Sequence, residues 1–143
     1  MGKSILNKNE NNEYTLVFLK PETVKRKLIG KIVSRFENKS LEIIKAKIMK
    51  MDVSTANEFY SEHKGKFFYD ELISEMCKNE IFCIILHGKN AIQVVRKMVG
   101  STNPFEAEPG TIRGDFGLDY TNNIIHASDS ESSYIRESNI LFP

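Results

Sequence analysis

The segment Ile81-Phe-Cys-Ile-Ile-Leu-His-Gly88 is an apolar run that is closed by a glycine. Short apolar runs of this length are typical of a strand that is buried on both faces. The next segment, Asn90-Ala-Ile-Gln-Val-Val-Arg-Lys-Met-Val-Gly100, places apolar residues at helical spacing between a candidate capping asparagine and a terminating glycine. A buried strand followed by an amphipathic helix is therefore predicted here.

The residues before this pair predict further strands and helices. Tyr14–Leu19 is an apolar run that stops at a proline, which cannot continue a ladder of hydrogen bonds. Apolar residues recur at helical spacing through 22–39, and residues 41–51 alternate between apolar residues and lysines. Residues 52–78 show helical spacing twice, with an interruption at 64–66. The predicted order is strand, helix, strand and two helices.

The residues after the pair add one loop, one strand and one helix. Residues 101–119 hold two of the four prolines and three of the eight glycines, which predicts a long, structured loop. Residues 122–127 predict a short strand, and Ser128-Asp-Ser-Glu131 fits a capping box that opens a final helix. We therefore expect an α+β, ferredoxin-like βαββαβ sandwich, in which helices cover one face of a four-stranded, mainly antiparallel sheet. Residues 1–13 are polar and predict a flexible tail, so the domain would span 14–143.

Composition limits the classes of function. The chain has 143 residues, of which 41% are hydrophobic and 27% charged, and a net charge of +1. This is the composition of one soluble globular domain, and it gives no bulk electrostatic reason to expect a nucleic-acid or membrane partner. The two cysteines are too few for a disulfide scaffold, and we find no membrane span and no secretory signal. We expect a cytoplasmic protein.

Three separated cations lie near predicted loop boundaries. Lys20 follows the first strand, Arg96 lies on the helix before the long loop, and Arg113 lies within that loop between Gly110 and Asp115, with glycines close by. The sequence has neither a P-loop nor a G-x-G-x-x-G motif, so a phosphate site would need side-chain cations of this kind. Either the three converge on one anion, or each is a solvated surface charge.

The sharpest chemical signal is a histidine between a strand and a helix, in Asn123-Ile-Ile-His-Ala-Ser-Asp129. Neutral imidazole is nucleophilic near pH 7 and needs little activation. A carboxylate on the next helix, such as Glu137, could orient the ring of His126 by a hydrogen bond. From spacing alone, a nucleophile and a structural histidine are about equally favoured, whereas His63 and His87 give no indication of a site.

These segments together resemble a known family. Asn123–Asp129, preceded by Thr102-Asn-Pro104 and by Pro109-Gly-Thr-Ile-Arg-Gly-Asp-Phe116, is similar to the nucleoside diphosphate kinases. The resemblance extends from about Tyr14 to Phe142. It implies an enzyme that transfers the γ-phosphate of a nucleoside triphosphate, mainly ATP, to nucleoside diphosphates by a ping-pong mechanism, and so maintains nucleoside triphosphate pools.

The resemblance also implies roles for individual residues. His126 corresponds to the histidine that takes the phosphoryl group, and Ser128 and Glu137 to a hydrogen-bonded pair that fixes its ring. Tyr60 corresponds to a tyrosine beside the histidine, and Phe68 and Leu72 to an apolar clamp on the nucleobase. The positions that hold the nucleotide phosphates are Lys20, Arg96, Thr102 and Arg113, and those near the ribose hydroxyls are Lys20 and Asn123.

The resemblance further implies a cofactor and an assembly. Mg²⁺ would be carried on the β- and γ-phosphates, without a cluster of acidic ligands. The loop around Pro104 matches the one that builds contacts in hexameric members, so we expect a homo-hexamer, with a tetramer as the alternative. The chain departs from common family residues at Lys27, where glycine is frequent, and at Lys66-Phe67, where Arg-Pro is common.

Two other classes of function compete with this interpretation. An RNA-recognition domain has a similar βαββαβ layout, but Lys64-Gly-Lys-Phe-Phe68 matches its aromatic motif only superficially. A member kept as a nucleotide-binding scaffold without transfer activity would be expected to lack His126 or Arg113, and both are present. We therefore predict an active enzyme and no specific nucleic-acid partner.

Overall fold

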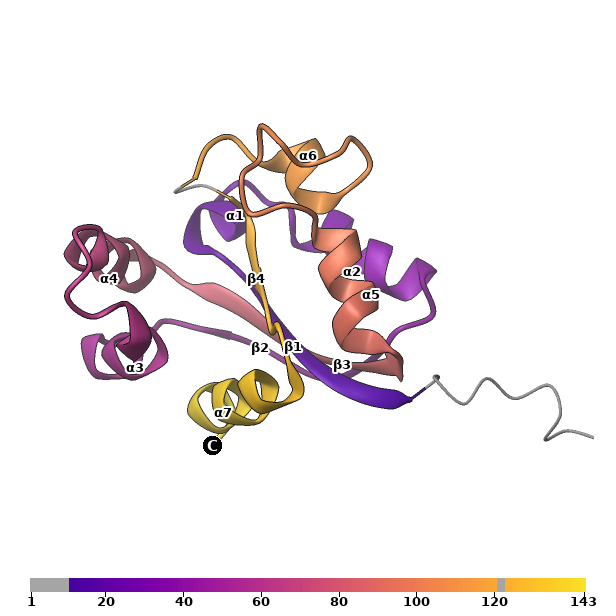
Figure 1. The fold of residues 1–143 in the computed structure, drawn as a ribbon, viewed down its shortest axis with the longest axis horizontal. Coiled ribbons are helices and arrows are strands. Elements are labelled where there is room, and N and C mark those ends of the chain that lie inside the picture. Colours follow the sequence, from indigo (N-terminus) through magenta and orange to yellow (C-terminus); the bar gives the residue numbers. More distant parts are fainter. Residues whose placement is uncertain (1–10, 121–122) are drawn as a thin grey trace, which may run out of the picture.

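Four strands form one antiparallel sheet in the computed structural model, which describes residues 11–120 and 123–143 (Figure 1). They are β1 (Asn12–Leu19), β2 (Glu42–Met49), β3 (Ile81–Lys89) and β4 (Ile125–Ala127), in the order β2-β3-β1-β4. The predicted βαββαβ sheet is confirmed, although β4 covers only three residues. Asn122, which we expected to begin this strand, lies outside the described residues.

Helices pack on both faces of the sheet, so the expectation of one covered face is wrong. Val17 and Leu19 of β1 belong to one core with α2 (Ile29–Asn38) and α5 (Ala91–Val99). Leu16 and Phe18 belong to a second core with α3 (Val53–Phe59), α4 (Tyr69–Lys78) and α7 (Glu131–Leu141). Because alternate residues of a strand face opposite sides, the uninterrupted apolar run of β1 requires a cover on each side.

The helix predicted at 22–39 is divided into α1 (Pro21–Lys25) and α2. Lys27 lies between them with a φ of 61°, a left-handed conformation that ends the first helix. Side chains with a Cβ adopt this conformation at a cost, whereas glycine adopts it freely. The apolar spacing continues across the break, which is why periodicity alone did not reveal it.

The other helical predictions differ from the structure in detail. Residues 52–78 form α3 and α4 as expected, with the short 3₁₀ helix η2 (Ser61–His63) between them. The segment 64–68 lies in this connection and not on a strand, which removes the basis for an RNA-recognition sheet. The loop 101–119 contains one further helix, α6 (Ile112–Phe116), which is too short to show a period.

Three predicted termini are corrected by the contacts. Asn90 precedes α5 without capping it, because its side-chain oxygen accepts instead from the backbone N–H of Asn11 at 3.2 Å. The cap of α7 is Ser130, which accepts from the N–H of Ser133 at 3.1 Å, and not Ser128. Asn12 and Glu13 pair with β3, so the ordered domain begins before Tyr14.

Two observations concern cysteines and membranes. Cys83 is buried and Cys77 is partly buried, and both are free thiols. Burial raises the pKa of the Cys83 thiol to about 12. None of the helices within residues 11–120 and 123–143 has the length and apolar character needed to cross a bilayer.

Candidate active site

One large cavity brings the predicted site residues together. Its volume is about 890 Å³, which is within the usual range for small-molecule sites. All the predicted residues except Ser128 line it, and Ser128 lies behind Glu137. The lining residues predicted from the sequence are Lys20, Tyr60, Phe68, Leu72, Arg96, Thr102, Arg113, Asn123, His126 and Glu137.

His126 lies in the middle of β4, directly opposite Phe18 of β1. The neighbouring residues Ile125 and Ala127 point into the core beneath α2 and α5, so the strand's alternation turns the imidazole to the opposite face. There its ring stacks on Phe18, with centroids 5.0 Å apart, and meets the ring of Phe59 edge-on at 5.1 Å. Two aromatic walls therefore fix the plane of the histidine.

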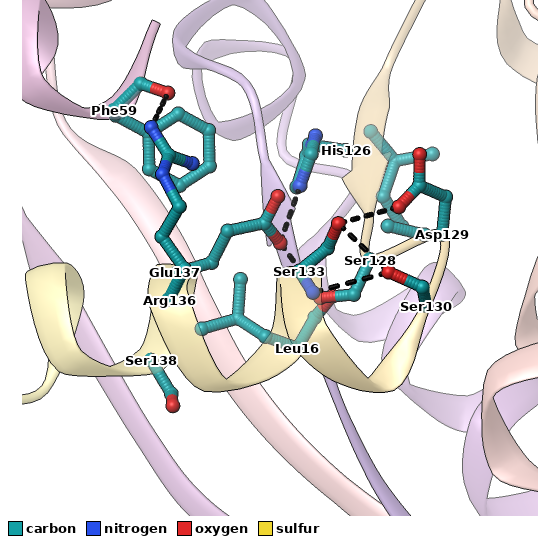
Figure 2. A network of polar contacts seen from close by, with 12 residues as sticks. Leu16, Phe59, His126, Ser128, Asp129, Ser130, Ser133, Arg136, Glu137 and Ser138 are labelled. Atoms are coloured by element: carbon teal, nitrogen blue, oxygen red, sulfur yellow. Dashed lines mark hydrogen bonds and ion pairs between the residues drawn. The ribbon is translucent and has the colours of Figure 1, made fainter. Parts of the chain in front are cut away.

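A buried carboxylate holds one edge of the imidazole. His126 Nε2 lies 2.9 Å from Glu137 Oε1, and the same oxygen accepts a hydrogen bond from the Ser128 hydroxyl at 2.7 Å (Figure 2). Ser128 is in turn anchored to β1, where its backbone N–H donates to the carbonyl of Leu16 at 2.9 Å. Because a carboxylate accepts hydrogen bonds, this contact favours the tautomer with its proton on Nε2. The lone pair then lies on Nδ1, which has no hydrogen-bond partner within the described part of the chain.

Arg113 is the most constrained of the three cations. Its guanidinium donates to the carbonyls of Asn123 (3.1 Å), Gly100 (3.0 Å) and Ile125 (2.7 Å), and the side chain is buried. A guanidinium carries more N–H groups than these three bonds use, so it can still donate to a ligand in the cavity. Burial, and secondarily the charge of Arg96, lower the pKa of Arg113 to about 10.

Lys20 lies at the end of β1, where the chain turns into α1. Its side chain is partly buried, and this burial, with a further contribution from Arg113, lowers its pKa to about 8. Neither Lys20 nor Arg113 forms an ion pair with any of the residues that the structure describes. The cavity therefore holds cations whose charge is not neutralised by the protein.

The chain turns sharply just before β4. The N–H of Ile125 donates to the carbonyl of Asn123 at 3.0 Å, which closes a three-residue turn around Ile124, whose φ is 81°. This strained conformation is held by two donors to the Ile124 carbonyl, the backbone N–H of Lys20 at 3.0 Å and the Thr23 hydroxyl at 2.7 Å. Asn123 is thereby placed at the cavity, with its buried Oδ1 lacking a partner among the described residues.

Apolar and aromatic side chains form one part of the cavity wall. Phe68 and Leu72 lie there as predicted, with the exposed ring of Phe67 5.4 Å from that of Phe68, and the exposed ring of Tyr120 also lines the cavity. His63, from which no site was expected, also lines this part of the wall, with its ring 5.6 Å from that of Phe68. Nothing in the spacing of the sequence indicates that Tyr120 and His63 approach the same space.

Arg96 and Tyr60 are two further predicted residues of the cavity, and each has identified contacts. Arg96 donates to the carbonyl of Ala127 at 3.4 Å, and its charge contributes to the lowered pKa of Asp129, which is caused chiefly by a hydrogen bond from Ser133. Tyr60 is buried beside Phe59, with ring centroids 5.0 Å apart. Burial and the nearby Glu137 carboxylate raise the pKa of its hydroxyl, so Tyr60 remains a neutral donor.

The arrangement suits attack by a neutral imidazole on an anionic group. The free Nδ1 lies on a rigid ring, a carboxylate can compensate the charge that the ring gains, and cations are gathered at the same cavity. Phosphoryl transfer depends mainly on such positioning and charge stabilisation. The apolar part of the wall, in contrast, offers flat surfaces that suit an aromatic base.

Comparison with known sequences agrees with this chemistry. The family model described as "Nucleoside diphosphate kinase" matches residues 13–143. A nucleoside diphosphate kinase of Methanocaldococcus jannaschii is 57% identical over 130 residues, which cover 91% of this chain and 93% of the relative. That of Sulfurisphaera tokodaii is 52% identical over 128 residues, covering 90% of this chain and 87% of the relative.

Solved structures give the same result for the fold. The nucleoside diphosphate kinase of Halobacterium salinarum in complex with CDP superposes with a TM-score of 0.90 at 41% identity, covering 92% of this chain and 88% of that one. The Aquifex aeolicus nucleoside diphosphate kinase also has a TM-score of 0.90, at 34% identity, covering 93% of this chain and 96% of that one.

Proposed function

The chain belongs to the nucleoside diphosphate kinase family, and we propose that His126 is the residue through which it performs the family's reaction. The protein is a phosphotransferase that moves the γ-phosphate of a nucleoside triphosphate, mainly ATP, to nucleoside diphosphates. The family's mechanism is ping-pong, through a phosphohistidine, and it maintains nucleoside triphosphate pools. The following roles are proposed for the individual residues of the cavity.

His126 Nδ1 attacks the γ-phosphorus in the first half-reaction. The bond from phosphorus to the bridging oxygen breaks, the nucleoside diphosphate leaves with the electron pair of that bond, and the phosphoryl group stays on Nδ1. Glu137 keeps the proton on Nε2 and compensates the positive charge that the ring acquires, as supported by the 2.9 Å contact between them. An acceptor diphosphate reverses these steps in the second half-reaction, at the same cavity.

The cations Lys20, Arg96 and Arg113 hold the phosphates and stabilise the charge on the transferred oxygens, assisted by Thr102. Their convergence on the cavity that His126 faces is the single observation that carries this proposal. The buried Oδ1 of Asn123 accepts a hydrogen bond from a ribose hydroxyl of the nucleotide. The Lys20 ammonium also contacts the ribose in this proposal. Tyr60 donates its hydroxyl beside the histidine.

Phe68 and Leu72 hold the nucleobase by its faces. Stacking and apolar contact are available to every base, so this clamp predicts weak discrimination among bases. The exposed rings of Phe67 and Tyr120 add further flat surface to the cavity.

Mg²⁺ is the proposed cofactor, and it fits a site without ligands of its own. The described residues include no group of three or more side chains able to hold a metal ion. Two carboxylates of the cavity are already engaged, Glu137 by Ser128 and Asp129 by Ser133. Mg²⁺ is commonly carried on substrate phosphates, where it neutralises the charge that develops during transfer.

The proposed assembly is a homo-hexamer, with a tetramer as the alternative. Phe105, beside Pro104 in the loop before α6, is 76% exposed, and the edge strand β2 exposes Ile44 and Ile48. Exposed edges of this kind are normally covered by another chain or element. Light scattering after size exclusion would distinguish six copies of the 16.4 kDa chain from four.

The two free thiols and the nucleotide substrates support a cytoplasmic location.

A labelling experiment tests the role of His126. The protein is incubated with Mg²⁺ and γ-labelled ATP, chased with unlabelled GDP, and the protein-bound label is tested for acid lability. We expect acid-labile label that moves to GDP, and its complete loss in His126→Gln, which should still bind nucleotide. His87→Gln, on β3 and outside the cavity, is the matched control.

Either of two results would contradict the proposal. Label retained by His126→Gln would show that another residue is the nucleophile. A native protein that is folded and binds nucleotide but takes no label would be a binding or scaffold member of the family.

A further inference from the structure

Arg136 forms a contact between helices for which the reaction described above has no role. It lies on α7, one residue before Glu137, and its guanidinium reaches the end of α3. Its Nη2 donates to the carbonyl of Glu58 at 2.7 Å, to that of Phe59 at 2.8 Å, and to the Ser61 hydroxyl at 3.3 Å. The last carbonyls of a helix have no partners within the helix, and a cation there also complements the helix dipole. Arg136 is thus a C-terminal cap of α3 supplied by α7.

The end of α3 forms the wall beside the imidazole. Phe59, the last residue of α3, meets the His126 ring edge-on, with centroids 5.1 Å apart and planes at 79°. The same ring packs against Phe18, on which the histidine stacks, at 5.5 Å. Arg136 Cζ lies 6.0 Å from the Phe59 ring, at the limit of a cation–π contact. The backbone that Arg136 caps therefore carries the ring that confines the histidine.

Arg136 and Glu137 are adjacent in one helical turn, so their side chains leave the helix in different directions. Glu137 reaches the Nε2 edge of His126, whereas Arg136 reaches across to Phe59 (Figure 2). Both contacts are made from the same rigid element. A movement of α7 relative to α3 would change the distance between the Glu137 carboxylate and the Phe59 ring. The hydrogen bonds of the Arg136 guanidinium oppose that movement.

We propose that Arg136 is a positioning residue of phosphoryl transfer, which fixes α3 to α7 so that Phe59 and Glu137 hold the His126 ring between them. This inference rests on the proposed role of His126. The role concerns the Nη2 bonds to α3 and the following turn, and it requires no contact with the nucleotide, although Arg136 also lines the cavity. The role requires a donor at this position, and not merely a positive charge in the cavity.

The test compares Arg136→Met and Arg136→Lys with the native protein. Quenched-flow measurements of protein phosphorylation by ATP should show a rate constant about tenfold lower in Arg136→Met, with less than a twofold change in the KM for ATP. The lysine variant, which can still donate to a carbonyl at the end of α3, should recover part of this loss. Lys47→Met is the matched control, because Lys47 packs on Phe142 at the other end of α7 and does not line the cavity.

A spectroscopic measurement separates positioning from simple destabilisation. In ¹H–¹⁵N and ¹H–¹³C spectra of the folded native protein, the ring signals of His126 carry the ring-current effect of Phe59. These signals should shift in Arg136→Met and remain in place in Lys47→Met, at a temperature where both variants are folded. If the methionine variant fails to fold, the comparison is made with Arg136→Gln and Arg136→Lys.

Two results would overturn this inference. An unchanged phosphorylation rate, with unmoved His126 signals, would show that the α3–α7 contact has no effect on the histidine. A raised KM with an unchanged rate constant would make Arg136 a nucleotide-binding residue. Failure of the proposed function is distinguished from both by the His126→Gln labelling experiment, which does not involve Arg136.

Discussion

Replacing Lys20 with methionine should stabilise the folded protein at neutral pH while weakening catalysis. Burial lowers the pKa of this ammonium from 10.5 to about 8, so the charged form is disfavoured in the native state. At about 1.4 kcal/mol per pKa unit, the shift corresponds to about 3 kcal/mol of native-state destabilisation at pH 7. Allowing for water that still reaches the cavity, we expect methionine to raise the unfolding free energy by about 1–3 kcal/mol at pH 7, or Tm by roughly 3–10 °C.

The sign of the pH dependence follows from proton binding. Between about pH 8 and pH 10.5 the unfolded chain holds the Lys20 proton more tightly than the native protein does. Native stability therefore rises with pH over this interval, and the penalty is lost once both states are neutral. The advantage of Lys20→Met should accordingly be full below about pH 8 and should shrink as the pH approaches 10.5.

The assay is thermal unfolding of the native protein, Lys20→Met and the matched control Lys25→Met, whose exposed lysine ends the short helix α1 that follows Lys20. All three are measured at one protein concentration, at pH 7, 9 and 10.5, because assembly affects Tm. The value of kcat/KM should fall about 10–100-fold in Lys20→Met alone, as expected for the loss of a charged hydrogen bond worth about 1.5–3 kcal/mol. The reasoning would be refuted if Lys20→Met were no more stable than the control at pH 7. It would also be refuted if its stability advantage over the control were as large at pH 10.5 as at pH 7.

Three further changes test other parts of the structure. Glu137→Gln removes the charge that faces His126, and quenched-flow phosphorylation should slow about 10–100-fold, since charged hydrogen bonds contribute about 1.5–3 kcal/mol, while nucleotide affinity changes less than threefold. Arg113→Lys places its N–H groups on a single nitrogen, which cannot reach the three carbonyls that Nε, Nη1 and Nη2 of Arg113 bind, so the unfolding free energy in urea should fall by about 2–4 kcal/mol; an unchanged value would show that these three bonds do not stabilise the fold. Lys27→Gly relieves the left-handed conformation and should raise the unfolding free energy by about 0.5–1 kcal/mol, whereas a decrease would argue against strain there.

β1 and β3 were predictable because their apolar runs are continuous and end near a proline or a glycine. Pro21 and Gly88 mark the ends of β1 and β3 within a few residues, although Gly88 itself lies in β3 and pairs with Glu13. The side of the sheet that each helix covers was not predictable from these runs. A strand that is apolar on both faces does not say which helix packs on which face, and that assignment depends on how the connections cross the sheet.

The residues that line the cavity were predicted through the family resemblance that the motif around His126 carries, whereas spacing alone left this histidine as either a nucleophile or a structural residue. The partners that position these residues were not predictable from spacing. Ser128 looks like a helix cap in the sequence, yet it holds Glu137 and β1 instead. Arg136 looks like an exposed charge on an amphipathic helix, and only the packing of α7 against α3 gives it acceptors. Contacts between residues 75 or more positions apart leave no local pattern.

The cations of the cavity show how the fold prepares the site before a nucleotide binds. Arg113 lowers the pKa of Lys20, and Arg96 lowers that of Arg113, so the three charges repel one another within a partly dehydrated space. The carbonyl bonds of Arg113 prevent it from moving away, and the turn at Ile124 holds the backbone of Lys20 in place. An incoming polyphosphate removes this repulsion, and its binding should therefore raise the pKa of Lys20 toward its ordinary value. Under the proposed function, phosphate binding offsets the free energy that these buried cations cost the native state, and transfer requires no rearrangement of the cations.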